Sequence, residues 1–243
     1  MTEIFQKEIT VMEYECDVQK KLRLSGFMHH AQQMGSDHLA AKGIGYRKMY
    51  EDHMVFVVNK LVIQIRRRPE FPEQLKLTTI PKQPKGVQFI RDTIFETVSG
   101  EALAEVSISW ALINPETRRI LRPSAFDCYG FQFNPNDGEY ITSYKLRRPQ
   151  GVKTFHQRQI KYSDLDYNGH VNNSVYADIV CDLLPLEWMQ QKEVKKLGIL
   201  YHREAKPGQV LQIESVPYEM GKGWYFNGRT ENSPCFEAEI LFD

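Results

Sequence analysis

Apolar and polar residues alternate along the chain in two successive series of segments, and each series contains one segment with a helical period. Strict alternation is typical of strands with one buried face, and apolar spacings of three and four are typical of helices. In the first half we expect a helix over Leu22–Ala41 and strands over Phe5–Met12, Val55–Ile65, Gln74–Ile80, Val87–Thr97 and Ala102–Ile113. In the second half we expect a helix over Val171–Leu184 and strands over Val152–Tyr162, Leu197–His202, Val210–Val216, Gly223–Thr230 and Cys235–Phe242.

The two series follow one plan, which is a strand, a helix and four further strands. The likeness extends to detail, since Phe71–Leu77 resembles Lys206–Gln212 and each is followed by another proline, at Pro81 and Pro217. The pattern indicates a duplicated α+β unit in which an antiparallel sheet wraps a long helix. Because pairing of edge strands removes an aggregation hazard, we expect one continuous sheet with two helices against it.

A polar segment separates the halves. Residues 134–151 are rich in Asn, Pro, Gly and charged side chains, a composition typical of a linker that crosses a protein surface. The predicted organisation is therefore a first domain over residues 1–133, a linker over 134–151 and a second domain over 152–243.

Bulk composition narrows the possible functions. The 243 residues include 31 basic and 31 acidic side chains, so no overall field favours nucleic acid or a membrane surface. No apolar run is long enough to span a bilayer, and the first ten residues do not resemble a secretory signal. We expect a cytoplasmic protein whose cysteines are reduced and mostly buried thiols, at Cys16, Cys128, Cys181 and Cys235.

The most informative run of residues lies just before the second predicted helix. Asp166, Asn168 and His170 occupy alternate positions in an extended approach, so an acid, an amide and an imidazole point one way. They stand beside the positive end of the predicted helix, an arrangement that suits attack on a polarised carbonyl. Asp, Asn and Gly are also ordinary turn residues, so a tight turn ahead of a capped helix is the alternative.

The start of that helix offers hydrogen-bond donors. Asn172 and Asn173 are good N-cap residues, and the first N–H groups of a helix have no partner within it. These groups can bind a substrate oxygen. The seven histidines show no metal-ligand spacing, and no Gly-rich phosphate loop is present, so we expect no metal and no nucleotide cofactor.

Two elements of the sequence are distinctive: the run Asp166-x-Asn168-x-His170-Val171-Asn172-Asn173 and the tyrosine-containing segment Tyr201–Ala205. Through these elements, and over nearly its whole length, the chain resembles the acyl-(acyl carrier protein) thioesterases of bacteria and plants. The first, more specific element is similar to the catalytic loop and helix start of that family. The resemblance implies an α+β fold, a tandem double hot-dog in which an antiparallel sheet wraps two long helices.

The resemblance also implies a division of labour. Glu204 would be the acidic catalytic residue, and the second half would carry the chemistry. The first half would shape the acyl pocket, since its corresponding loop, residues 17–22, has no Asn–His pair. There is one departure from plant members, because Ala205 stands where they have a cysteine once proposed as a nucleophile. The chemistry would then use carboxylate, amide and imidazole groups, at one active site per chain.

The expected reaction is hydrolysis of a thioester. N–H groups of Val171, Asn172 and Asn173 would form an oxyanion hole, and Glu204 or His170 would take a proton from water. Two more residues complete the expected site, in which Asn168 holds the water or the carbonyl and Asp166 orients the loop. A covalent route through a carboxylate of Glu204 or Asp166 stays open.

The expected substrate is a fatty acyl chain carried on the phosphopantetheine of acyl carrier protein, and its release would end fatty acid synthesis. Hydrolysis of acyl-CoA is the alternative on the same fold, and a non-catalytic acyl-thioester-binding protein is a weaker one. Nucleic acid and membrane insertion are not expected, and a homodimer is left open. The Leu22–Ala41 helix, through Met28 and Met34, is a candidate to line an acyl tunnel, although such residues are more often core.

Overall fold

A computed structural model describes residues 3–136, 140–218 and 221–243, and in these ranges ten strands form one antiparallel sheet. Its strands are β1 (Phe5–Thr10), β2 (Val55–Ile65), β3 (Gln74–Lys85), β4 (Gln88–Thr97), β5 (Ala102–Ile113), β6 (Thr154–Gln159), β7 (Val194–Tyr201), β8 (Val210–Pro217), β9 (Gly223–Arg229) and β10 (Pro234–Phe242). The helices are α1 (Leu24–Ala41), α2 (Tyr46–Glu51), α3 (Tyr140–Ser143), α4 (Val175–Asp182) and α5 (Leu186–Gln191). Short 3-10 helices are η1 (Glu13–Glu15), η2 (Pro123–Tyr129) and η3 (Tyr162–Asp164).

The strand order joins the two halves edge to edge. It runs β1-β3-β4-β5-β2-β7-β10-β9-β8-β6, so β2 of the first half pairs with β7 of the second. At this junction Leu61 lies opposite Ile199, and both side chains are fully buried. The expected continuous sheet is confirmed.

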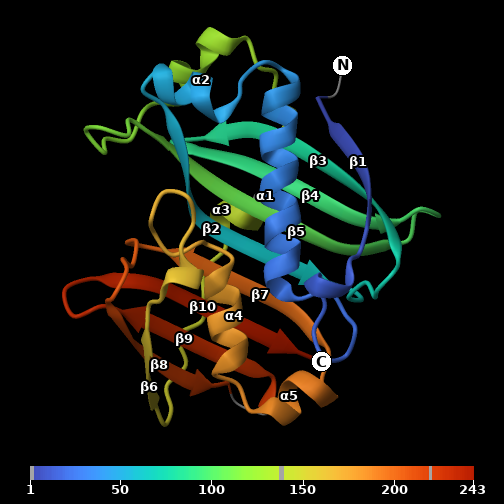
Figure 1. Cartoon of the computed structure of the whole chain (residues 1–243), viewed down its shortest axis with the longest axis vertical. Coiled ribbons are helices and arrows are strands. Elements are labelled where there is room, and N and C mark those ends of the chain that lie inside the picture. The colour runs from blue at the N-terminus through green and yellow to red at the C-terminus, as the bar shows by residue number, and fades with distance from the viewer. Residues whose placement is uncertain (1–2, 137–139, 219–220) are drawn as a thin grey trace.

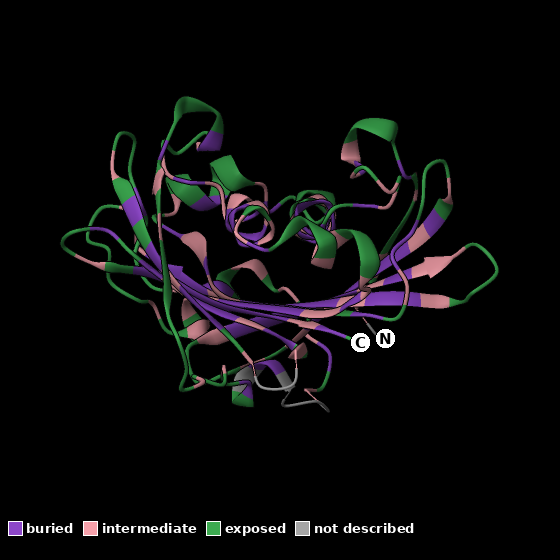
Figure 2. Ribbon diagram, turned by 90° about the horizontal axis from the view of Figure 1, so that it is seen from below, coloured by how far each residue is buried: buried purple, intermediate pink, exposed green. Residues whose placement is uncertain are grey.

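Helices α1 and α4 lie side by side within the concave side of the sheet (Figures 1 and 2). The buried face of α1 includes Phe27 and Ala31, and that of α4 includes Ala177 and Ile179, which all join the main core. Of these side chains, Phe27 and Ile179 are large, and burial of each stabilises the fold by roughly 1.5–3 kcal/mol. The helices therefore anchor both halves to one shared core.

The second helix is shorter than the sequence predicts. We expected it over Val171–Leu184, but α4 begins at Val175 and ends at Asp182. The backbone of Val171 pairs with Leu165, which keeps the preceding residues extended. Asn172 is not the N-cap, since its side chain instead accepts bonds from Ser174, the residue that precedes the helix. A local side-chain turn thus replaces the first helical turn.

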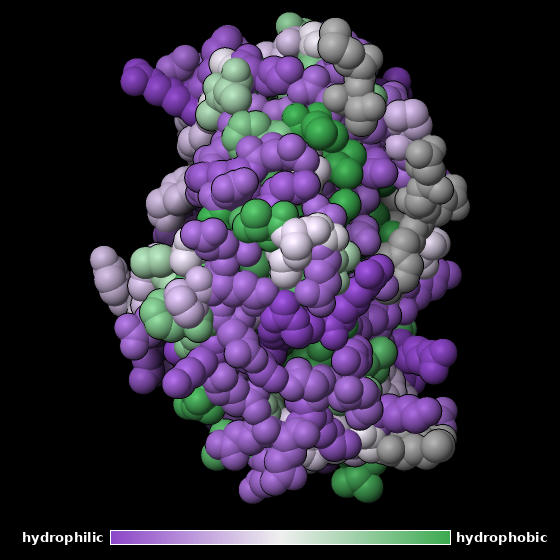
Figure 3. Space-filling view, turned by 90° about the vertical axis from the view of Figure 1, so that its right-hand side faces the viewer, coloured by the Kyte–Doolittle hydropathy of each residue, from purple (hydrophilic) through white to green (hydrophobic). Residues whose placement is uncertain are grey.

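The surface agrees with a folded globular protein. The face turned to the viewer in Figure 3 is mostly hydrophilic, with hydrophobic residues in smaller groups between the polar ones. Among the residues that the structure describes, no helix has both the length and the apolar character to cross a membrane. Of the four cysteines, which we expected to be mostly buried, Cys16 and Cys235 are buried, Cys181 is half-buried and Cys128 is exposed.

The segment between the halves is packed against the sheet. Residues 140–151 cross the outer face, opposite α1 and α4 (Figures 1 and 2). Residues 137–139 of the predicted linker lie outside the described ones. Ile141 and Tyr144 are buried there, and the Lys60 ammonium donates to both of their carbonyls, at 2.9 and 3.1 Å. The polar composition did not indicate this burial. The division into domains at residues 133 and 151 stays a prediction.

Two buried carboxylates of β10 accept hydrogen bonds from the segment between the halves. The Tyr144 hydroxyl donates to Glu239 at 2.5 Å, and the Arg148 guanidinium donates to both oxygens of Glu237 at 2.8 and 2.9 Å. Gly198 leaves room for Tyr144, since a Cβ there would stand 2.0 Å from its hydroxyl oxygen. Outward-facing acids of a strand, normally solvated, are therefore fixed under the connecting segment.

Glu237→Gln is expected to lower the free energy of unfolding at pH 7 by about 1–3 kcal/mol, because a charge-assisted buried acceptor is lost. Burial raises the pKa of Glu237, but hydrogen bonds from Arg148, Tyr225 and His202 outweigh it and hold the pKa at about 2, below the ordinary 4.5. The contribution is therefore complete above pH 4.5 and decreases as the pH falls toward 2. Urea unfolding of both proteins at pH 7 and pH 3 checks this, and an equal difference at both pH values contradicts it.

Candidate active site

The loop before α4 is organised by one carboxylate. Asp166 Oδ1 accepts the N–H groups of Asn168 at 2.8 Å and His170 at 3.3 Å, and the Asp166 N–H donates to the His170 carbonyl. Gly169 has a φ of +78°, which L side chains rarely adopt. Asp166 thus faces its own loop, and its second oxygen accepts a hydrogen bond from the Asn168 side-chain amide at 3.4 Å.

Glu204 lies beside His170 but belongs to a different part of the fold. It follows β7 in the turn after Tyr201, and its Oε2 lies 3.4 Å from Nε2 of His170. Both side chains are about a third exposed, at 36% and 28%. The structure therefore brings together the imidazole and the acid that the sequence placed 34 residues apart (170 and 204).

The N–H groups at the start of the helix are largely occupied. Val171 donates to the carbonyl of Ala205 at 3.2 Å, and Asn172 donates to that of Asp164 at 2.8 Å. These two groups are in backbone hydrogen bonds, which corrects the expected set of three open donors. In the described part of the chain, Asn173 is the member of the set whose N–H makes no such bond.

All seven sequence-predicted residues border one cavity of about 1830 Å³. They are Asp166, Asn168, His170, Val171, Asn172, Asn173 and Glu204. Three exposed tyrosines also border the cavity, and the ring of Tyr46 contacts those of Tyr50 and Tyr167. The Tyr46 hydroxyl donates to Asn168 Oδ1 at 3.4 Å, so α2 of the first half reaches the loop of the second.

The cavity continues into an aromatic region of the first half. Phe126 of η2 lies against Phe56, Phe89 and Phe131, with ring centroids 5.4–5.8 Å apart. These four rings line the cavity and belong to one buried cluster. Such a wall accommodates apolar ligands and offers them no hydrogen bond.

One charged side chain interrupts this apolar wall. Arg91 of β4 is 9% exposed, and it bonds to His38 Nδ1 at 3.1 Å and to Thr79 Oγ1 at 3.3 Å. Burial lowers the pKa of Arg91 to about 10, although Glu3 opposes this, so the guanidinium is charged at neutral pH. Gly35 of α1 makes room for it, because a Cβ there would approach the Arg91 side chain to 3.3 Å.

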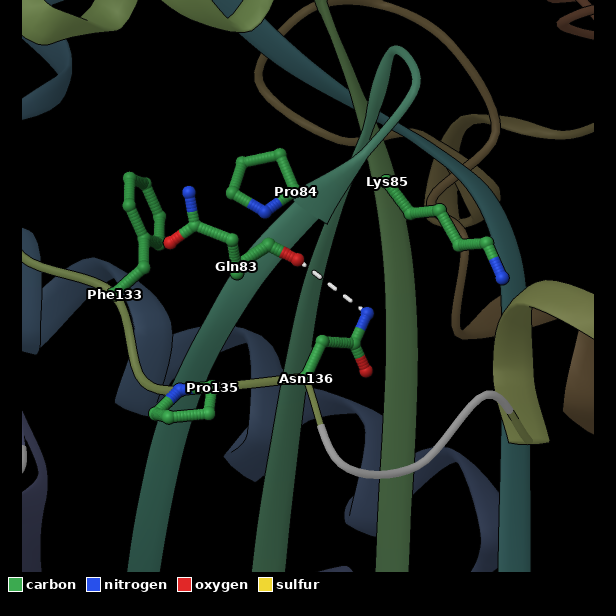
Figure 4. Close-up of a pocket in the computed structure, with 6 residues that line it drawn as sticks. All are labelled: Gln83, Pro84, Lys85, Phe133, Pro135 and Asn136. Carbon is green, nitrogen blue, oxygen red and sulfur yellow. Dashed lines mark hydrogen bonds between the residues drawn. The ribbon is translucent and has the colours of Figure 1, made fainter.

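A smaller hollow of about 350 Å³ lies at the β3–β4 hairpin and is lined by Gln83, Pro84, Lys85, Phe133, Pro135 and Asn136 (Figure 4). Asn136 Nδ2 donates there to the Gln83 carbonyl at 3.4 Å. None of the sequence-predicted site residues borders this hollow.

The first half contains a copy of the loop with different chemistry. Asp17 Oδ1 accepts the N–H groups of Gln19 and Lys21 at 2.8 and 3.3 Å, the same distances at which Asp166 binds the residues two and four positions further on. The first-half loop therefore repeats the backbone hydrogen bonds of the second-half loop, but it lacks the Asn–His pair, as the sequence indicated.

The residue that faces the first-half loop is basic, whereas Glu204, which faces the second-half loop, is acidic. Leu22 N–H bonds to the Pro69 carbonyl as Val171 N–H bonds to that of Ala205, so Arg68 occupies the place of Glu204. Arg68 is 1% exposed and donates to Asp17 at 2.5 Å and to Gln19 at 2.8 Å. The copied loop is filled by its own side chains and does not border the large cavity.

Sequence reasoning missed two residues of this site, Tyr46 and Arg118. The Arg118 guanidinium donates to Glu204 at 2.8 Å from a turn 86 residues earlier in the chain. No local pattern signals either contact, because both depend on how the two halves meet.

The amino-acid sequence matches two domains of a known protein family. The N-terminal domain of acyl-ACP thioesterases matches residues 2–124, and their C-terminal domain matches residues 147–236. The chain belongs to the acyl-ACP thioesterase family. Similar curated proteins include a chloroplastic palmitoyl-acyl carrier protein thioesterase of Arabidopsis thaliana, 23% identical over 86% of this chain and 54% of its own length. A second, from Cuphea viscosissima and named a chloroplastic acyl-[acyl-carrier-protein] hydrolase, is 22% identical over 91% of this chain and 57% of its own length.

Solved structures show the same fold. The 12:0-ACP thioesterase of Umbellularia californica has a TM-score of 0.86 at 18% identity, covering 100% of this chain and 98% of its own. An acyl-ACP thioesterase of Bacteroides thetaiotaomicron has a TM-score of 0.85 at 20% identity, covering 99% and 98%. The predicted tandem double hot-dog is confirmed. The chain spans about half the length of the curated relatives it matches first.

Proposed function

We propose that this protein hydrolyses fatty acyl-(acyl carrier protein) to a free fatty acid and the carrier protein, and so ends chain growth in fatty acid synthesis in the cytoplasm. One observation carries the proposal: an imidazole–carboxylate pair, His170 and Glu204, borders a cavity that is also lined by a cluster of aromatic rings. A thioester carbonyl beside this pair would place its acyl chain against apolar side chains. Family membership supports the same substrate class.

In the proposed mechanism a water attacks the carbonyl carbon while His170 or Glu204 accepts its proton. Asn168 holds the water, and its side chain is itself held by Tyr46 and by Asp166. The tetrahedral oxyanion accepts a hydrogen bond from the N–H of Asn173, and one such donor contributes about 3–4 kcal/mol in the transition state. When the carbon–sulfur bond breaks, the leaving thiolate takes this proton from the protonated base, His170 or Glu204.

Asp166 has a supporting role in this mechanism. Its oxygens accept bonds from its own loop, so it orients Asn168 and His170 and does not attack the substrate. Ala205 is fully buried and has no reactive group, so no thiol replaces the water at that position. These contacts favour water attack over a covalent route through Asp166.

The test is release of free thiol from matched acyl-carrier-protein and acyl-CoA thioesters of increasing chain length. Faster turnover of the carrier-protein series is the expected result. Faster turnover of the CoA series would replace the partner and keep the chemistry, and no cleavage of either series would favour a binding role. Light scattering on the same sample measures whether the chain forms a homodimer.

A further inference from the structure

The turn that follows β5 holds one arginine in an unusual conformation. Asn114 Oδ1 accepts the N–H groups of Glu116 and Thr117 at 3.0 and 2.8 Å, and the Asn114 carbonyl accepts that of Arg118 at 2.9 Å. Arg118 has a φ of +57°, in the left-handed region that favours glycine. Such a conformation is costly for an arginine and persists where the surroundings fix it.

The strained arginine points to the other half of the chain. Its Nη2 donates to Glu204 Oε2 at 2.8 Å, and this is the oxygen that lies 3.4 Å from His170 Nε2. Arg118 also borders the large cavity. The neighbouring Arg119 is exposed, and its side chain makes no hydrogen bond or ion pair to any described residue.

The stability of the exposed Arg118–Glu204 ion pair does not account for the strained conformation of Arg118. Arg118 is 57% exposed and Glu204 36% exposed, and pairs of this kind contribute little to the stability of a fold. A charge-assisted bond to a carboxylate does fix the direction of that carboxylate. Here it turns one oxygen of Glu204 toward the imidazole.

We infer that Arg118, contributed by the first half, is a positioning residue that holds Glu204 toward His170 for hydrolysis. The inference rests on the proposed function. It gives the first half a second task besides enclosing the acyl chain, since the acid of the second half is oriented from across the junction.

Arg118→Met is expected to lower kcat roughly 10- to 100-fold with KM unchanged, because a catalytic group is misplaced and the substrate is not. Arg119→Met is the matched control and is expected to keep wild-type kcat. In a Glu204→Gln background, Arg118→Met is expected to add no further loss, since its partner is already changed. An equal further loss in that background, or an effect on KM alone, would assign Arg118 to substrate binding and overturn the inference.

Arg118→Gly separates positioning from folding. Glycine adopts a positive φ without strain, so the variant is expected to melt at or above the wild-type temperature while kcat falls as in Arg118→Met. Rescue of the glycine variant by added guanidinium ion at non-denaturing concentration is expected as well. A lower melting temperature without rescue would indicate a structural role and overturn the inference.

One measurement is independent of the proposed function. If wild-type protein cleaves no thioester, the proposed function fails, and urea unfolding of Arg118→Met, Glu204→Gln and the double variant still decides the contact. A small but measurable non-additive change in the unfolding midpoint is expected, because the contact holds Glu204 but is exposed. Additive changes would show that Arg118 does not hold Glu204, and would overturn the inference on their own.

Discussion

His170→Ala is expected to lower kcat/KM for acyl-carrier-protein thioesters by about 10²–10⁴-fold, the usual loss when a general acid–base group is removed. His170 is the imidazole that meets Glu204 at the edge of the cavity, and it is partly exposed, so its removal is expected to leave the fold intact. The measurement is initial thiol release at several substrate concentrations, beside a thermal melt of the same sample.

His156→Ala is the matched control for this variant. His156 lies on β6, bonds to Ser215 at 2.9 Å and does not border the cavity, so its variant is expected to keep wild-type kcat/KM. Wild-type activity in His170→Ala would remove His170 from the mechanism, whatever the control does.

Phe126→Ala is expected to have the largest effect on stability, a loss of about 3–5 kcal/mol in the free energy of unfolding. Phe126 is 2% exposed and lies at the centre of the aromatic wall, so its truncation leaves a cavity that neighbouring rings fill only in part. The enlarged cavity is also expected to move the preferred acyl chain to a greater length. Urea unfolding and the thioester panel measure the two effects.

Phe155→Ala provides the comparison, because Phe155 is a 70% exposed phenylalanine of β6. Its truncation is expected to change the free energy of unfolding by no more than about 0.5 kcal/mol. If Phe126→Ala keeps the wild-type chain-length preference, the aromatic wall does not enclose the acyl chain.

Much of the fold was predictable because it depends on local periodicity. The alternation in Ala102–Ile113 reproduces β5 residue for residue, and the predicted Leu22–Ala41 helix differs from α1 only at its first two residues. The start of α4 was not predictable in this way. Asn172 is a good N-cap residue in general, but here it bonds to Ser174 inside a turn.

Contacts between distant segments set the limit of sequence reasoning. Met28 and Met34, candidates for an acyl tunnel, lie in the main core and do not border the cavity, so the alternative assignment to the core holds for them. Asn168 and His170 could be selected because they lie close together in a recognisable run, whereas Arg118 could not. Their catalytic roles stay predictions until the variants are measured.

The unbroken sheet restricts how a long ligand reaches its place. Strands β2 and β7 are paired from Lys60 to Gln64, so separating the halves would break a hydrogen-bonded ladder inside a buried core. A two-lobed protein that closes on its ligand by hinge motion needs a flexible junction, and a paired, buried ladder opposes such motion. On the proposed function, the acyl chain would therefore thread in by its methyl end past Tyr46 and Tyr167, and the time needed for entry would grow with chain length.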